Sequence, residues 1–290
     1  MNNLRKMILA ILVIISTWQV VAQEANAIFN TAKSLVLEQN YSEALSKYKD
    51  AFATEIGDSV QLAEAYGYAG ICLEETGNVR EALKHYKKAL NYKVLELSIY
   101  DKAISLTKEM KNHEMHEWAL MEKVKYFPEF KVDVEKALSS HYLKTKQYDK
   151  LLISSEKMGQ WFPDSPKYKY YMGVAYQSQG DIDQAVEAYK LALDKDAEYT
   201  SANMRLGHIL FEKGNKVYAK KKKAYEAIAK PTRVDYSNYH KSLEEAKVIY
   251  REAEGYLLKA YQVKQDPNLK KMLYAVYTRL GEKEKALKFK

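Results

Sequence analysis

Cysteine, proline and glycine are scarce in this chain of 290 residues, which has one Cys, five Pro and 11 Gly. A single Cys excludes a disulfide within the chain, and the low Pro and Gly content, with few strand-forming residues, favours helices. The sequence contains no phosphate-binding glycine loop, nucleophile elbow or helical zinc-protease motif. We therefore expect a helical chain without enzymatic activity, cofactor or metal.

Tyrosine, in contrast, is frequent, with 25 residues, and it recurs at fixed distances from small residues. Three Ala residues each have a small residue twelve positions earlier, a Tyr four positions later and an Ala seven positions later. The three sets are Ala32, Ala44, Tyr48 and Ala51; Gly70, Ala82, Tyr86 and Ala89; and Gly173, Ala185, Tyr189 and Ala192. Such spacings predict pairs of amphipathic helices, and their shared register indicates an internal repeat with a period of ~34 residues.

The stretch from Ser165 to Tyr199 resembles a unit of the tetratricopeptide repeat (TPR) family, at its small-residue, Tyr, Gly-Asp, Ala, Tyr and Ala positions. The resemblance spans nearly the whole chain after residue 22, and it implies an all-α fold: a right-handed α-solenoid of helix-turn-helix repeats that binds protein. We expect about seven units, at residues 25–58, 63–96, 97–130, 132–165, 166–199, 200–267 and 268–290, the last one partial.

The third and fourth units depart from this pattern. Their second helices are predicted at residues 114–127 and 148–162, and each is followed by Pro, where this family often closes a unit. Large residues replace the usual Ala in both, so we predict their helices but not their register.

The sixth unit is predicted to form an elongated hairpin. Its first helix is followed by a long helical run that breaks at Pro231 and resumes near Ser237. The second run carries a heptad seam at Tyr239, Leu243, Ala246, Tyr250, Ala253, Leu257 and Ala260. At a rise of ~1.5 Å per residue, the antiparallel arm would extend about 20–25 Å beyond its neighbours. Alternatively, the region is two separate units, because Ala219 and Ala253 are one period apart.

The first 22 residues have the pattern of a signal peptide. Arg5 and Lys6 precede an apolar run from residue 7 to 15, and small or apolar residues occupy positions 20 to 22. Cleavage is predicted after Ala22, which implies an exported bacterial protein of the periplasm or outer membrane. The alternative is a retained anchor, although the apolar run is shorter than the ~20 residues that span a bilayer.

The partner-binding residues are expected on the concave face, which this family usually uses. In the predicted register this face presents Tyr170, Val174, Gln177, Met204, His208 and Phe211. The alternative is that these side chains pack between adjacent helices. Some family members grip a C-terminal carboxylate there, but Val174 occupies a position where that pattern has Asn, so we do not predict this clamp.

A second candidate surface is the basic run Lys220, Lys221, Lys222 and Lys223. It would bind anionic envelope components, with a solvated helix face as the alternative, and Lys221 would lie on the seam of the arm. The leading hypothesis is a non-enzymatic scaffold that binds a protein or peptide partner in the cell envelope. Peripheral envelope association through the basic arm is the alternative hypothesis, and we expect no nucleic-acid partner.

Overall fold

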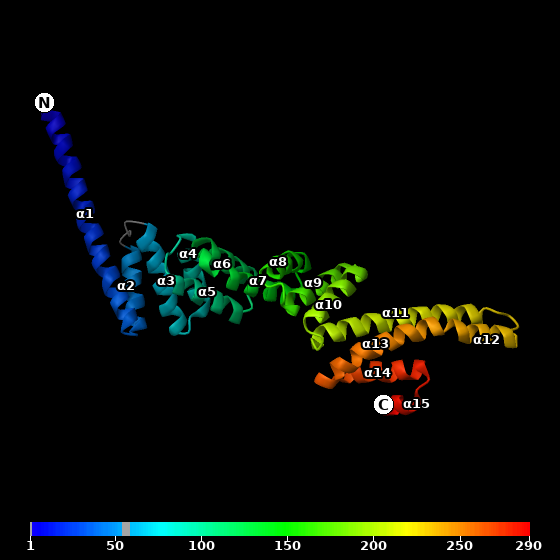
Figure 1. The fold of residues 1–290 in the computed structure, drawn as a ribbon. Coiled ribbons are helices and arrows are strands. Elements are labelled where there is room, and N and C mark those ends of the chain that lie inside the picture. The colour runs from blue at the N-terminus through cyan, green and yellow to red at the C-terminus, as the bar shows by residue number, and fades with distance from the viewer. Residues whose placement is uncertain (1, 54–58) are drawn as a thin grey trace. The chain divides into compact units, whose positions relative to one another are not determined.

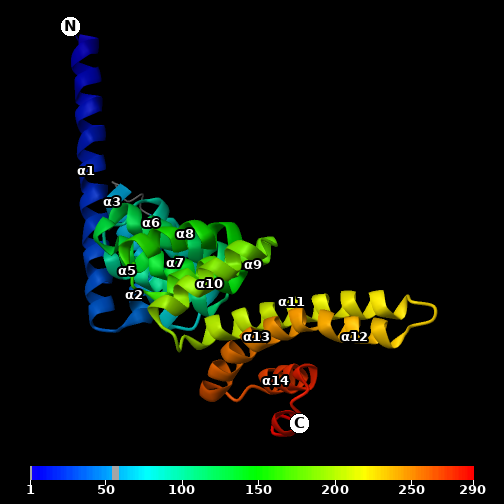
Figure 2. The same cartoon turned by 45° about the vertical axis from the view of Figure 1, so that its right-hand side comes forward.

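The computed structural model describes the backbone of residues 2–53 and 59–290 (Figure 1). The described residues form helices and short turns, and none of them belongs to a β-strand. Most helices pack in consecutive antiparallel pairs, and each pair packs on the next within its unit (Figures 1 and 2). The predicted α-solenoid class, with one elongated hairpin, is therefore confirmed.

Two compact units divide the chain, Met1–His141 and Tyr142–Lys290. The first contains α1 (Asn2–Leu37), α2 (Tyr41–Ala53), α3 (Ser59–Glu75), α4 (Val79–Asn91), α5 (Leu97–Glu109), α6 (His113–Tyr126), the 3₁₀ turn η1 (Pro128–Phe130) and most of α7 (Lys131–Thr145). The second contains α8 (Tyr148–Trp161), α9 (Pro166–Gln179), α10 (Ile182–Lys195), α11 (Thr200–Glu226), α12 (Arg233–Ser242), α13 (Glu244–Val263), α14 (Pro267–Leu280) and α15 (Lys283–Leu287).

A small residue of the first helix lies against a Tyr of the second in two of the predicted pairs. A Cβ atom on Gly70 would lie 2.7 Å from the ring of Tyr86, and one on Gly173 would lie 2.5 Å from the ring of Tyr189. Each of these two Tyr hydroxyls donates a hydrogen bond back to the first helix, to Glu74 at 2.5 Å and to Gln177 at 2.7 Å. The predicted register of these pairs is thus confirmed, because the small residue makes room for the ring.

The turn sequences around Gly77, Gly180 and Gly214 predict three helix ends, of which the first two are observed, whereas α11 continues through Gly214. Gly77 and Gly180 have φ angles of +83° and +87°, in the left-handed region that favours glycine. Cys72 lies one turn before the first of these ends and is fully buried. Burial raises the pKa of its thiol to about 11, which is typical of a packing residue and not of a nucleophile.

The elongated hairpin is formed by α11 on one side and by α12 and α13 on the other; below, residues 216–249 are called the arm. Contacts between the two sides continue along the whole hairpin. At its base a Cβ on Gly207 would meet Leu257, and Gly214 lies against Tyr250. Within the arm the ring of Tyr225 stacks on that of Tyr239, with 4.7 Å between the ring centroids. The predicted seam is confirmed, since its residues from Leu243 to Ala260 are buried. The two-unit alternative is wrong, because α11 continues through Gly214 without a turn.

Two details of the arm differ from the prediction. The second run begins at Arg233, four residues earlier than expected, because Thr232 and Asp235 form a capping box that starts α12 directly after Pro231. The run is also interrupted at Leu243, where α12 ends and α13 begins. The amide of Leu243 is shared between the carbonyl groups of Tyr239 and His240, so one turn is locally tightened.

Residues 2–37 form one continuous helix, α1, in which the predicted signal segment is continuous with the first repeat helix. The described side chains before residue 24 are exposed, whereas Ala25, Phe29 and Ala32 are buried in the first helix pair. Within the part of the chain that the structure describes, we find no helix whose length and apolarity suffice for a membrane span.

Candidate binding surfaces

The predicted concave-face residues of α9 are largely packed against other side chains. Tyr170 is partly buried, with its ring centroid 5.8 Å from that of Tyr189 and 5.6 Å from that of Tyr199. Val174 is 5% exposed, and Gln177 accepts the hydrogen bond from Tyr189. At Tyr170 and Val174, packing between helices accounts for the side chains, and their role in binding stays a prediction.

The predicted residues of α11 are more varied. Met204 is partly buried, and Phe211 lies 6.2 Å from the ring of Tyr250, at the base of the hairpin. His208 is exposed. Of the six predicted residues, His208 and Gln177 come together in one groove, and the other four do not line it.

We call this feature the α10–α11 groove. It has a volume of about 460 Å³ and runs along α10 and α11, with the end of α9 and one residue of α13 closing it. Its lining residues are Gln177, Ile182, Asp183, Val186, Lys190, His208, Ile209, Leu210, Glu212, Lys213, Lys216 and Glu252. Ile182 is 43% exposed at its mouth. Apolar side chains with charges of both signs around them are suited to a protein segment.

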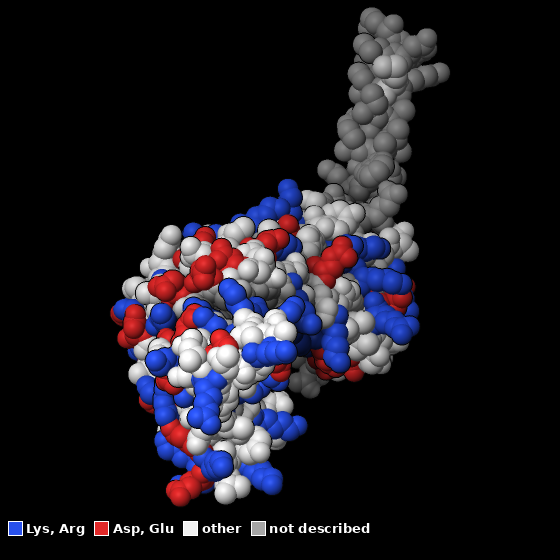
Figure 3. Space-filling model, turned by 90° about the vertical axis from the view of Figure 1, so that its right-hand side faces the viewer, with Lys and Arg blue, Asp and Glu red and all other residues white. Residues whose placement is uncertain are grey.

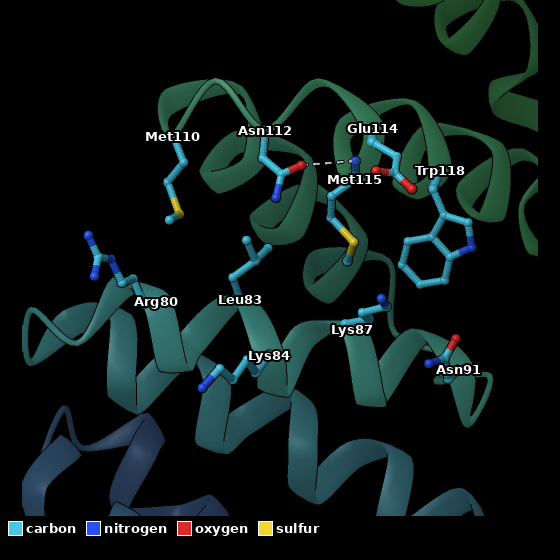
Figure 4. Close-up of a pocket in the computed structure, with 10 residues that line it drawn as sticks. All are labelled: Arg80, Leu83, Lys84, Lys87, Asn91, Met110, Asn112, Glu114, Met115 and Trp118. Atoms are coloured by element: carbon cyan, nitrogen blue, oxygen red, sulfur yellow. Dashed lines mark hydrogen bonds between the residues drawn. The ribbon is translucent and has the colours of Figure 1, made fainter.

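A second groove lies in the other compact unit, between α4 and the α5–α6 turn with α6 (Figure 4). This α4–α6 groove has a volume of about 540 Å³ and is lined by Arg80, Leu83, Lys84, Lys87, Asn91, Met110, Asn112, Glu114, Met115 and Trp118. Asn112 caps α6, its side chain accepting from the amide of Met115 at 3.2 Å. The cap fixes the start of α6 and with it the wall of the groove.

The four consecutive lysines of the arm have different surroundings. Lys221 is partly buried, and its ammonium group pairs with Glu245 of α13 at 2.9 Å; its place on the seam stays a prediction. Lys222 pairs with Glu226 at 3.4 Å, one turn along the same helix. Lys220 and Lys223 are exposed and make no ion pair with any residue that the structure describes. The run therefore offers two unpaired cations to solvent.

The arm as a whole is basic and has apolar side chains at its tip. It contains nine Lys or Arg and four Asp or Glu, so most of the formal charge of +8 lies on these residues. Ile228, Val234 and Tyr236 near the tip are 38%, 66% and 54% exposed. Figure 3 views the molecule from the side on which the arm ends in Figure 1, and on this face cationic (blue) and acidic (red) side chains are interspersed with uncharged ones (white).

Of the two His residues at the start of α6, His113 is exposed and His116 is buried. The Nδ1 atom of His116 lies 3.2 Å from the hydroxyl of Thr107 and 3.1 Å from the carbonyl oxygen of Ile104. His113, His116 and the ring of His141 are neighbours, with centroid distances to His141 of 5.6 and 5.2 Å. Among the described residues, no group of three His, Cys, Asp or Glu is placed to hold a metal ion.

Both grooves are lined largely by residues that the sequence did not single out. The expectation of a concave face directed attention to the first helix of each pair, whereas α4, α6 and α10 are second helices. A signal was available in α4: Arg80, Leu83, Lys84, Lys87 and Asn91 recur at helical spacing and fall outside the Ala82–Tyr86–Ala89 stripe.

Comparison with known families supports the repeat assignment for part of the chain. Residues 170–229 match the family model described as tetratricopeptide repeat. This range covers most of α9 and all of α10 and α11, and so includes the Gly173–Tyr189 contact. Domains of this type are typically modules of protein–protein interaction. No curated protein is significantly similar to the chain in sequence.

Several solved structures also match the chain, with TM-scores below 0.5. YrrB, described as a TPR protein with an unusual peptide-binding site, is 19% identical, with 60% of this chain and 88% of that chain covered and a TM-score of 0.41. A TPR repeats protein from Bacteroides fragilis NCTC 9343 is 22% identical over 88% and 98% of the two chains, with a TM-score of 0.37. MamA from Desulfovibrio magneticus RS-1 is 17% identical over 68% and 97%, with a TM-score of 0.40.

Proposed function

We propose that this chain is a non-enzymatic scaffold of the bacterial cell envelope, and that it binds a protein or peptide partner in the α10–α11 groove. The observation that carries the proposal is the groove itself, in which Ile182, Val186 and Ile209 offer apolar contacts beside the exposed His208. Its flanking charges include Asp183 and Lys190. An extended or helical segment would bury the apolar side chains and pair with the charges at the rim.

The proposal is tested by crosslinking in cells from the groove. A photoreactive amino acid at His208 is expected to give a discrete adduct with one protein, which mass spectrometry then identifies. The same group at Lys271, which is exposed on α14, is the control. The purified partner should then bind the chain and lose at least tenfold in affinity on Ile182→Glu. Equal yields of adduct at His208 and Lys271, or an affinity unchanged by Ile182→Glu, would contradict partner binding in the groove.

We also propose that residues 1–22 are a signal peptide, with the mature chain beginning at Gln23. In support, Ala25 is the first buried side chain among those of α1 that the structure describes, and Phe29 and Ala32 of the first helix pair also lie after residue 22. N-terminal sequencing of the protein from the envelope fraction should give Gln23 first. A chain that retains Arg5 and Lys6 would contradict cleavage.

A second candidate function is association with an anionic surface through the arm. It is favoured by the excess of Lys and Arg on residues 216–249, together with the exposed Ile228 and Val234 at the tip. Sedimentation with vesicles of anionic phospholipid should show binding that decreases steeply between about 50 and 500 mM salt, because screening shortens the range of such attraction. Equal binding to neutral and to anionic vesicles, or binding that does not change with salt, would exclude this function.

A further inference from the structure

The floor of the α4–α6 groove is apolar and belongs to the packed core. Leu83, Met110 and Trp118 are partly buried and pack against the core cluster that includes Tyr86 and Tyr100. Figure 4 shows Leu83, Met110 and Met115 directed into the space between the two walls, with Trp118 at one end. The groove is therefore preformed, and methionine side chains can adapt to the shape of an apolar ligand.

The α4 wall of the groove is positively charged. Arg80, Lys84 and Lys87 come from α4, and Glu114 is the one acidic residue of the lining. Lys84 pairs with Glu81 at 2.6 Å, but Arg80 and Lys87 have no ion pair with any residue in the described ranges. Acidic groups of a ligand would be stabilised beside Arg80 and Lys87, because no acidic side chain of the described residues forms an ion pair with these two cations.

The length of the groove matches a short helix. Its α4 wall is the stripe from Arg80 to Asn91, whose members are spaced as one face of a helix. At a rise of ~1.5 Å per residue this stripe is about 16 Å long, or three helical turns. A groove with an apolar floor and one helical wall of this length is the arrangement found in helix-in-groove recognition.

We propose that the α4–α6 groove binds an acidic amphipathic helix of a partner protein. The helix would place apolar side chains on Leu83, Met115 and Trp118, and Asp or Glu residues beside Arg80 and Lys87. This inference rests on the proposed function in that the chain binds protein, but it concerns a different groove and a defined chemistry. The partner of the α10–α11 groove, whose rim has both signs of charge, need not be acidic.

The test is an unbiased selection. The full chain is used to select from a displayed library of helical 14-residue peptides with randomised surface positions. Peptides that bind this groove should be rich in Asp and Glu on one face and in Leu, Met or Phe on the other. Their affinity should fall at least tenfold for R80E/K87E, and it should be unchanged for K270E/K271E, a matched reversal of two exposed or partly exposed lysines on α14.

Tryptophan fluorescence gives a second readout. A selected peptide that lacks Trp should shift the emission of the chain, and W118F should abolish most of that shift. Selected peptides without an acidic excess, or with equal affinity for R80E/K87E, would overturn the inference. If the affinity of the peptides falls instead for Ile182→Glu, the chain still binds protein, but in the α10–α11 groove and not in the α4–α6 groove. A dimer that R80E/K87E dissociates would show that a second copy of the chain is the occupant, and would also overturn it.

Discussion

Gly214 lies directly against the ring of Tyr250, where an added Cβ atom would come within 2.7 Å of Cε1. It follows Gly207 by seven residues, as Gly77 follows Gly70 and Gly180 follows Gly173. Those two turn glycines end a helix with positive φ, whereas Gly214 is buried inside α11. The same residue type in the same place thus serves close helix packing at the base of the hairpin and chain reversal elsewhere.

Gly214→Ala and Gly173→Ala are each expected to destabilise the fold by about 1–3 kcal/mol, because the rings of Tyr250 and Tyr189 must move from well-packed positions. Gly255→Ala is the matched control. Gly255 is helical, and nothing lies within 4 Å of its added Cβ. There the gain in helix propensity should stabilise by about 0.5–1 kcal/mol. Urea unfolding followed by circular dichroism measures all three, and a destabilisation shared by Gly255→Ala would contradict the steric explanation.

Repetition made the fold predictable, and its absence made the binding surfaces unpredictable. Ala185 and Tyr189 could be placed because the same spacing recurs around Ala44 and Ala82. The hairpin could be inferred because the apolar side chains of a heptad seam are buried only when a second helix packs against them. The break at Leu243 has no sequence signal, since that residue belongs to the seam. Met110 and Trp118 meet Leu83 only once two helix pairs have stacked, and no local pattern encodes that meeting.

The hydroxyl groups of two buried tyrosines provide a second prediction. The hydroxyl of Tyr189 donates to Gln177 at 2.7 Å, whereas that of Tyr48 is buried and has no hydrogen-bond partner among the described residues. Tyr189→Phe should therefore cost about 1 kcal/mol, and Tyr48→Phe should be neutral or stabilising. Thermal melts of the two variants make the comparison, and an equal loss in both would count against it.

Alkaline pH should destabilise the fold through its buried tyrosines. Burial raises the pKa of Tyr199 from 10.0 to about 12, and burial likewise raises the pKa values of Tyr48, Tyr86 and Tyr189. Above pH 10 the unfolded chain loses these protons while the folded chain retains them. The free energy of unfolding should thus fall as pH rises from 10 to 12, by up to about 1.4 kcal/mol per unit for each such Tyr.

Urea unfolding at intervals from pH 8 to 11.5, with phenolate absorbance recorded in parallel, tests the pH dependence. Tyr48→Phe should reduce the slope above pH 10 by the contribution of one tyrosine and leave stability at pH 8 nearly unchanged or slightly raised. A flat profile up to pH 11.5 would show that the tyrosine rings ionise as readily in the folded chain as in the unfolded one.

The arm should be removable as one unit. Deletion of residues 216–249 removes 34 residues, one full repeat period, and joins Asn215 to Tyr250. Ala253 then follows Gly207 by twelve residues, the spacing of Gly173 and Ala185. We expect Gly214 to end the first helix with positive φ, as Gly180 does, and Leu257 to keep its contact with Gly207.

The shortened chain should fold cooperatively and melt within a few degrees of the full chain, because each repeat depends mainly on its neighbours. Gly214→Ala in the shortened chain should still destabilise by about 1 kcal/mol, now because Ala disfavours the left-handed conformation. Vesicle binding should be lost if the arm provides it, while peptides that bind the α4–α6 groove should bind unchanged. Circular dichroism measures the folding and melting of the shortened chain, and the peptide assay measures binding in its α4–α6 groove. A shortened chain that is soluble but unfolded would show that the arm stabilises its own repeat.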